Sequence, residues 1–175
     1  MVNTDMVIAG AGIGGLAAAL ALARQGQAVQ VLERAEAFSE VGAGIQIGPN
    51  VTRILQAWGL NDALHAVAAF PKRLQACDAR SGRVVGELPL GERTQAVYGA
   101  PYASIHRADL HALLAEAALG AGAKVYLGHQ LQQVLQTDSG VQLQGVRADG
   151  SAWHMHSQAL PVSYTHLTLP TTSRV

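Results

Sequence analysis

The chain has 175 residues, of which 49% are hydrophobic and 14% are charged, and its formal net charge is zero. This balance suits one soluble globular domain or part of a larger one, and the lack of a basic run argues against a nucleic-acid partner. The single cysteine, Cys77, excludes an internal disulfide and fits a reducing cytoplasm, and we expect it to be a buried structural thiol.

The N-terminal segment has the residue order of a β-α-β unit. An apolar run at Met6–Ala9 predicts a buried strand, and an Ala/Leu-rich helix is predicted over residues 13–24. Gly26 lies where a helix-capping glycine belongs, and a second apolar run at 28–32 ends on Glu33. The glycines that interrupt the first apolar stretch argue against a signal peptide or a membrane span. Between the first strand and the helix, Gly10, Gly12 and Gly15 have the spacing G-x-G-x-x-G.

Each of these residue types has a physical role in holding a pyrophosphate. Gly10 permits a tight turn, Gly12 leaves room for the phosphates because it has no Cβ, and Gly15 allows close packing of the helix. The first N–H groups of the helix, at Ile13 and Gly14, then point toward the phosphates, whose negative charge the helix dipole favours.

The acidic residue after the second strand indicates how the dinucleotide's ribose is held. Glu33 lies about 20 residues beyond the glycines, where a carboxylate accepts hydrogen bonds from ribose hydroxyls. It would repel a 2′-phosphate, which disfavours NADP at this site, although the neighbouring Arg34 keeps that alternative open. A glycine-rich turn in some other α/β protein is the alternative explanation of the glycines.

A second glycine-rich segment follows at residues 41–50, VGAGIQIGPN, and Pro49 can begin a helix there. This segment either lets the backbone approach a flat ligand or is an ordinary connector. The pattern then changes to short strands that turn at Ser81-Gly82, and residues 91–101 are expected to be irregular. We therefore interpret residues 71–101 as an insertion into the nucleotide-binding domain.

The α/β pattern resumes with a helix predicted over residues 108–119. Arg107 stands at its start, where a cation opposes the helix dipole, and this placement favours contact with an anion over a merely exposed arginine. A strand at 124–127 and a β-meander of three strands, from residue 130 to about 160, complete the pattern. His154 and His156 make at most half a metal site, so no metal is expected, and no pattern identifies a catalytic residue.

Together these segments resemble the class A flavoprotein monooxygenases, the para-hydroxybenzoate hydroxylase-like family, and most closely its salicylate- and hydroxybenzoate-hydroxylating members. The resemblance covers about residues 4–160 and rests on VIAGAGIGGLAAALALARQGQAVQVLERA, VGAGIQIGPN and YASIHRADLHALLAEA. It implies an α/β fold in which residues 1–160 form the N-terminal part of a Rossmann-like FAD-binding domain. Residues 71–101 would belong to an inserted substrate-binding β-sheet.

The resemblance also implies a function. FAD rather than NAD would be the bound dinucleotide, and the full-length enzyme would use NADH or NADPH and O2 to hydroxylate a phenolic acid such as salicylate or hydroxybenzoate. Arg107 would contact FAD, residues 44–47 would lie along the flavin, and the strand around Leu131 would pass near the adenosine. The implied cofactor-binding residues are Gly10, Gly12, Ile13, Gly14, Gly15, Glu33, Arg34, Gly44, Ile45, Gln46, Arg107 and Leu131.

Two departures from the family qualify this interpretation. The second fingerprint containing Asp-Gly and the late Gly-Asp motif are absent, so we expect a truncated N-terminal portion that is inactive alone. Residues 161–175, PVSYTHLTLPTTSRV, change in composition and resemble a translated sequencing adaptor, so we expect them not to belong to the natural protein. The alternatives are another FAD-dependent oxidoreductase of the same fold and a non-catalytic nucleotide-binding module. The expected partner is a small aromatic substrate, without nucleic acid or membrane, and the sequence does not indicate the oligomeric state.

Overall fold

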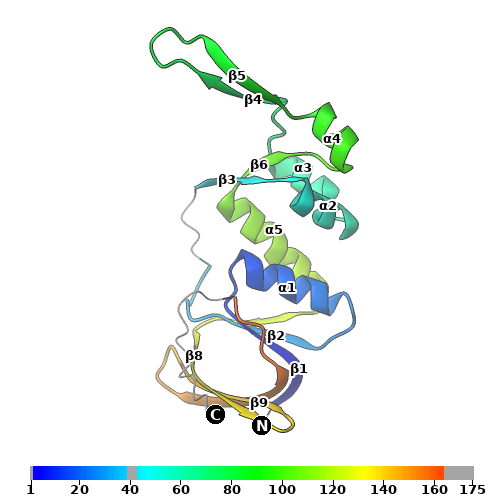
Figure 1. Cartoon of the computed structure of the whole chain (residues 1–175). Helices are drawn as coiled ribbons and strands as arrows, with labels where there is room; N and C mark the ends of the chain where they lie inside the picture. The colour runs from blue at the N-terminus through cyan, green and yellow to red at the C-terminus, as the bar shows by residue number, and fades with distance from the viewer. Residues whose placement is uncertain (1, 39–42, 164–175) are drawn as a thin grey trace, which may run out of the picture. The chain divides into compact units, whose positions relative to one another are not determined.

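The computed structural model describes residues 2–38 and 43–163. By its internal contacts the chain divides into two compact units, which we call unit 1 (Met1–Ser39 with Leu114–Val175) and unit 2 (Glu40–Leu113). Figure 1 shows the elements of both units. Among the described residues, no helix combines the length and the apolar character needed to cross a membrane.

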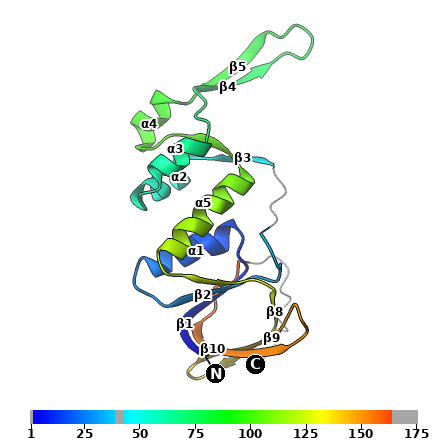
Figure 2. The same cartoon turned by 180° about the vertical axis from the view of Figure 1, so that it is seen from behind.

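Unit 1 is built on one six-stranded sheet. Its strands are β1 (Val2–Ala9), β2 (Val29–Leu32), β7 (Lys124–Tyr126), β8 (His129–Thr137), β9 (Gly140–Arg147) and β10 (Ala152–Ala159), in the order β7-β2-β1-β10-β9-β8. The first four strands of that order pair in parallel, whereas β9 is antiparallel to both of its neighbours. The predicted β-meander is therefore confirmed, and its last strand, β10, lies beside β1, as Figure 2 shows.

Helix α1 (Ile13–Ala23) connects β1 to β2, as the glycine and apolar pattern predicts. At its end the Gly26 N–H donates to the Ala23 carbonyl at 2.9 Å, and the Gln27 N–H donates to the Leu22 carbonyl at 3.2 Å. This pair of hydrogen bonds is a Schellman motif, which satisfies the last carbonyls of the helix. Gly26 has a φ of 81°, which glycine adopts without a Cβ clash.

The apolar core of unit 1 joins the first two strands to the meander. Val7, Leu32, Leu143 and Trp153 form a cluster in which no side chain is more than 4% exposed. Gly145 on β9 makes room for the indole ring, since a Cβ there would lie 2.5 Å from a Trp153 ring atom. Residues distant in the sequence thus depend on one another for burial. The partly buried side chains around the cluster are Tyr126, Leu131, Val134, Val141, Met155 and Leu160.

Unit 2 contains two small antiparallel sheets, one formed by β3 (Gly44–Ile47) with β6 (Ala103–His106) and one by β4 (Arg73–Cys77) with β5 (Val84–Pro89). The predicted turn at Ser81-Gly82 joins β4 to β5. Pro49 is the first residue of α2, as predicted, because its fixed φ suits that position. The helices are α2 (Pro49–Ala57), α3 (Asn61–Val67), α4 (Glu92–Tyr98) and α5 (Arg107–Gly120), and the residues of α5 from Leu114 onward belong to unit 1.

Two expectations for this part of the chain are wrong. Residues 91–101 are not irregular throughout, because α4 forms between Gly91, with a φ of 53°, and Gly99, which ends the helix with a φ of 73°. The buried side chain of Thr94 anchors α4. Cys77 is exposed rather than buried, because every residue of β4 and β5 is exposed.

Thr52 is a buried polar anchor of unit 2. Its side chain is 0% exposed, and Oγ1 donates a hydrogen bond to the Pro101 carbonyl at 2.6 Å. Thr52→Val keeps the shape but leaves that carbonyl unpaired, so we expect the free energy of unfolding to fall by about 1–3 kcal/mol in urea denaturation. Thr137→Val is the control and should lose less stability. The half-exposed hydroxyl of Thr137 donates to the Gly140 carbonyl at a place where water can replace it. Equal losses in the two variants would contradict this role.

Candidate functional site

The glycine-rich loop joins the end of β1 to the start of α1. Gly10 has a φ of 98°, and its N–H donates to the Leu32 carbonyl at 2.8 Å, which ties the loop to the end of β2. Gly12 is the N-cap residue of α1 and has no side chain with which to cap the helix. The N–H groups of the first turn, which include those of Ile13 and Gly14, therefore form the kind of helix start that binds anions.

The space around two of the glycines differs. A Cβ at Gly15 would overlap the Gly10 carbonyl oxygen and lie 3.5 Å from the Ile8 side chain, so only glycine lets α1 approach β1 this closely. A Cβ at Gly12 would have no described atom within 4 Å. Gly15 thus serves the packing of the unit, whereas the open side of Gly12 is available to a ligand.

Glu33 lies at the end of β2 with its carboxylate turned toward the glycine-rich loop. Oε2 accepts a hydrogen bond from the Ala11 N–H at 2.8 Å, and Oε1 accepts one from the Ala35 N–H at 2.9 Å. We call this pair of bonds the Glu33 clamp. A carboxylate offers about four acceptor positions, so about two remain for the hydroxyls of a ligand. Glu33 is half-buried and the adjacent Arg34 is exposed. The sequence predicts the carboxylate at this position but not the clamp.

Ser163 lies against the glycine-rich loop, and no motif in the sequence indicates it. Its N–H donates to the Ala9 carbonyl at 3.1 Å, and the Ala9 N–H donates to the Pro161 carbonyl at 3.1 Å. Its hydroxyl oxygen lies 2.7 Å from the position that a Cβ of Gly14 would take. Residues 164–175 lie outside the described residues, so the non-native origin expected for residues 161–175 stays a prediction.

Leu131 lies on β8 at an irregularity of the sheet. The register between β8 and β9 shifts between Leu131 and Gln133. Such a bulge leaves one residue outside the ladder of backbone hydrogen bonds. The Leu131 side chain packs against the core cluster that contains Trp153. The leucine side chain therefore contributes to the core of unit 1.

A second group of predicted residues lies together in unit 2. Residues 44–46 are on β3, and Gly44 lies opposite His106 in the pairing of β3 with β6. Arg107 follows His106 directly, begins α5, and donates its N–H to the Ala43 carbonyl at 3.0 Å. Backbone pairing therefore brings Arg107 next to Ala43 and Gly44 of the second glycine-rich segment, although they are far apart in the sequence.

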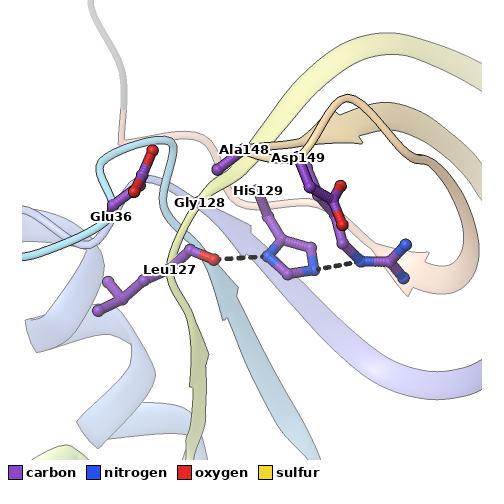
Figure 3. A pocket seen from close by; sticks show the side chains of 7 residues that line it. Glu36, Leu127, Gly128, His129, Ala148 and Asp149 are labelled. Atoms are coloured by element: carbon purple, nitrogen blue, oxygen red, sulfur yellow. Dashed lines mark hydrogen bonds between the residues drawn. The ribbon is translucent and has the colours of Figure 1, made fainter.

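A pocket of about 320 Å³ in unit 1, with charged side chains in its lining, was not indicated by any motif. Figure 3 shows His129 among the residues that line this pocket. Its Nδ1 lies 2.7 Å from the Leu127 carbonyl oxygen, and its Nε2 lies 3.3 Å from Nε of Arg147. The hydroxyl and N–H of Ser151 hold the pKa of the Asp149 carboxyl below its ordinary value. Within the described ranges, no three His, Cys, Asp or Glu side chains form a group that could hold a metal ion. The lining residues are Glu36, Leu127, Gly128, His129, Arg147, Ala148 and Asp149.

Comparison with known proteins places the chain among flavoproteins. The FAD binding domain family matches residues 3–158. The chain is 42% identical over 138 residues to the 3-hydroxybenzoate 6-hydroxylase of Polaromonas naphthalenivorans (strain CJ2), which covers 79% of this chain and 34% of the relative. It is 44% identical over 112 residues to the 6-hydroxynicotinate 3-monooxygenase of Pseudomonas fluorescens, covering 64% of this chain and 29% of that protein.

A solved structure has the same fold as this chain. The crystal structure of the flavin-dependent monooxygenase PieE in complex with FAD and substrate matches with a TM-score of 0.78 at 22% identity, covering 91% of this chain and 30% of PieE. These findings confirm the α/β FAD-binding fold, FAD as the predicted dinucleotide and the resemblance to flavoprotein monooxygenases. The chain spans 34% and 29% of the two curated relatives. Since the family match includes most of its residues, the chain belongs to the FAD binding domain family.

Proposed function

We propose that the chain is the N-terminal FAD-binding part of a flavoprotein aromatic hydroxylase, which uses NADH or NADPH and O2 to hydroxylate a phenolic acid. The observation that carries the proposal is the 42% identity to a 3-hydroxybenzoate 6-hydroxylase over 79% of the chain. The second relative is named for hydroxynicotinate, so the substrate class we propose is a ring-hydroxylated aromatic carboxylic acid, such as salicylate or a hydroxybenzoate. The reducing cytoplasm is the compartment we propose for it.

The described residues of unit 1 fit the ADP half of FAD. The open side of Gly12 and the N–H groups at the start of α1 suit a pyrophosphate, and the acceptor positions left on Glu33 suit the ribose hydroxyls. We assign the adenosine to the backbone near Leu131 and the flavin side to residues 44–46 and Arg107. When bound, FAD supplies the redox chemistry, and the residues of this chain bind and orient it.

The activity of the full-length gene product tests this function. We expect the purified protein to show flavin absorption bands and to oxidise NADH or NADPH faster when salicylate or a hydroxybenzoate is added, with a hydroxylated product. A yellow protein that forms no hydroxylated product would instead be another FAD-dependent oxidoreductase of the same fold. A colourless protein that binds NAD would be a nucleotide-binding module. The 175-residue chain alone should show no turnover.

Arg107 should matter for FAD binding because of its shape as well as its charge. Arg107→Lys keeps the positive charge but loses the planar fork of donors that grips a phosphate or a carbonyl. We expect this variant of the full-length protein to lose flavin faster on dilution, as measured by fluorescence of released FAD. Arg93→Lys, at an exposed position of α4, is the matched control and should retain flavin. Retention of FAD by Arg107→Lys at the parental level would refute the assignment.

We propose that residues 71–101 belong to a substrate-binding sheet of the longer protein. In the β4–β5 hairpin, Leu74 lies opposite Leu88 on one face, and Gln75 donates a hydrogen bond to Glu87 on the other. Leu74 and Leu88 are 54% and 56% exposed, so this apolar face lacks cover among the described residues. Apolar faces of this kind ordinarily pack against a partner surface.

The hairpin proposal predicts a difference between the two lengths of chain. Leu88→Ser should lower the free energy of unfolding of the full-length protein by about 1.5–3 kcal/mol, because a buried leucine contributes that much. In the 175-residue chain the same change should have little effect. Glu87→Ser, on the opposite face, should leave both proteins unchanged. Thermal unfolding of both variants in both proteins measures these effects. An equally small effect of Leu88→Ser in the full-length protein and in the 175-residue chain would refute the proposal.

A further inference from the structure

The turn Leu127–His129, between β7 and β8, is bonded to the segment that carries Glu33. The His129 N–H donates to the Glu33 carbonyl at 2.8 Å, and the Gly128 N–H donates to the Ala35 carbonyl at 2.9 Å. The same backbone that presents the Glu33 carboxylate to the glycine-rich loop is therefore held in place by this turn.

The other side of the turn packs against the connection between β9 and β10. Gly128 has a φ of 65°, and a Cβ there would lie 3.2 Å from the Cβ of Ala148. His129 and Arg147 lie directly opposite each other in the β8–β9 ladder, so their side chains share one face of the sheet. The turn thus lies between the Glu33 segment and the end of the meander.

The two hydrogen bonds of the His129 ring require a neutral imidazole. The Leu127 carbonyl can only accept, so Nδ1 carries the proton and donates at 2.7 Å. Nε2 must then offer its lone pair to the Nε–H of Arg147 at 3.3 Å, because a guanidinium can only donate. Figure 3 shows both contacts as dashed lines. A proton on Nε2 would replace this hydrogen bond with two donors and two positive charges facing each other.

Arg147 extends this link into the next turn. Its Nη1 donates to the Ser151 hydroxyl at 3.1 Å and to the Ala152 carbonyl at 3.5 Å. The neutral His129 ring therefore connects the Glu33 segment to the β9–β10 turn through one guanidinium. Loss of the His129–Arg147 bond would remove this side-chain link between the two turns.

The charged groups around the ring set the direction of the effect. The carboxylates of Glu36 and Asp149 line the same pocket, and the rings of Tyr126 and Trp153 lie at 5.6 and 6.1 Å from the His129 ring. Asp149 stays ionised in mild acid, because the Ser151 hydroxyl and N–H lower its pKa. A protonated ring would be repelled by Arg147 and attracted by these carboxylates. Both effects would weaken the contact between the ring and Arg147 in acid.

We propose that His129 is a positioning residue for Glu33, and that its neutral ring, bonded to Arg147, makes FAD binding weaken in mild acid. The inference rests on the proposed FAD site. The direction of the pH effect follows from the hydrogen bond between His129 Nε2 and Arg147 Nε. This bond exists only while the ring is neutral. It is therefore complete at higher pH and is lost as the pH falls and the ring gains a proton.

The test compares the FAD affinity of the full-length protein at about pH 7.5 and at about pH 5.5. The parent should bind FAD about threefold more weakly at the lower pH, the size expected of one exposed charged contact. His129→Gln offers Arg147 an acceptor that does not titrate, so its affinity should change less. His154→Gln, at an exposed position of β10, is the matched control and should behave like the parent. Equal pH dependence in the parent and His129→Gln would overturn the proposal.

A second measurement does not depend on FAD. In protein labelled with ¹⁵N-histidine, the His129 signals, identified by their loss in His129→Gln, should report a proton on Nδ1 and a lone pair on Nε2 at about pH 7.5. A proton on Nε2 at that pH would overturn the proposal. Absence of flavin binding at both pH values would refute the proposed function, while the ring signals would still decide whether Arg147 holds a neutral His129.

Discussion

Replacing Glu33 by alanine should lower the FAD affinity of the full-length protein by on the order of 100-fold. A charge-assisted hydrogen bond contributes about 1.5–3 kcal/mol, and the carboxylate has acceptor positions left for the ribose hydroxyls. The loss of one or two such bonds therefore accounts for a change of this size. Flavin released on serial dilution, followed by fluorescence, gives the dissociation constants of the parent and the variant.

The Glu33 clamp adds a second effect of the same substitution. Without the carboxylate, the N–H groups of Ala11 and Ala35 lose their acceptors, and the glycine-rich loop is no longer tied to the end of β2 by a side chain. We expect faster amide exchange at Ala11 even without FAD. Glu33→Gln should also fail to restore binding, because its NH₂ group would meet one of these two N–H donors.

The control is a carboxylate in the same segment. Glu36→Ala removes an equal charge from an exposed position, so any general electrostatic effect on a phosphate-bearing ligand should appear there too. We expect Glu36→Ala to leave the FAD affinity within about threefold of the parent, as exposed charges contribute little. Equal losses in Glu33→Ala and Glu36→Ala would show that charge, and not the hydrogen bonds of Glu33, governs binding.

The first β-α-β unit is predictable because each of its signals is local. The glycine spacing, the apolar runs and the helix-capping Gly26 act over a few residues, and the observed α1 ends one residue before the predicted boundary. The helix α4 is not predicted, because its seven residues carry no apolar periodicity and one buried threonine, Thr94, anchors it. The exposure of Cys77 also escapes prediction, since alternation shows that a strand has two faces but not whether either face is covered.

Contacts between distant parts of the chain are the least predictable. The glycine motif indicates an acidic residue after β2, yet nothing in it shows that Glu33 would bond the Ala11 N–H. The pairing of His129 with Arg147 depends on the register of β8 and β9, which a bulge alters at Leu131, and sequence alternation does not reveal such a bulge. These bonds set the geometry of the site, whereas the motif shows only which residues are present.

The substitutions Gly15→Ala and Gly12→Ala should separate folding from cofactor binding. A Cβ at Gly15 would overlap the Gly10 carbonyl oxygen, which is backbone and cannot rotate away. We expect Gly15→Ala to lower the free energy of unfolding by about 1–3 kcal/mol or more, as overpacking of a tight contact does. Urea denaturation of the protein without FAD measures this loss.

Gly12→Ala should have the opposite effects, leaving the free energy of unfolding unchanged and weakening FAD binding. Gly12 has an extended backbone, with φ of −72° and ψ of 179°, which alanine adopts readily, and a Cβ there would have no described atom within 4 Å. The free energy of unfolding without FAD should therefore stay within about 0.5 kcal/mol of the parent. FAD retention should nevertheless fall sharply, because the added methyl group would occupy the side from which a pyrophosphate approaches the backbone. If Gly12→Ala retained FAD at the parental level, the open side of the loop would not be the phosphate site; if it unfolded as readily as Gly15→Ala, Gly12 would serve packing as well.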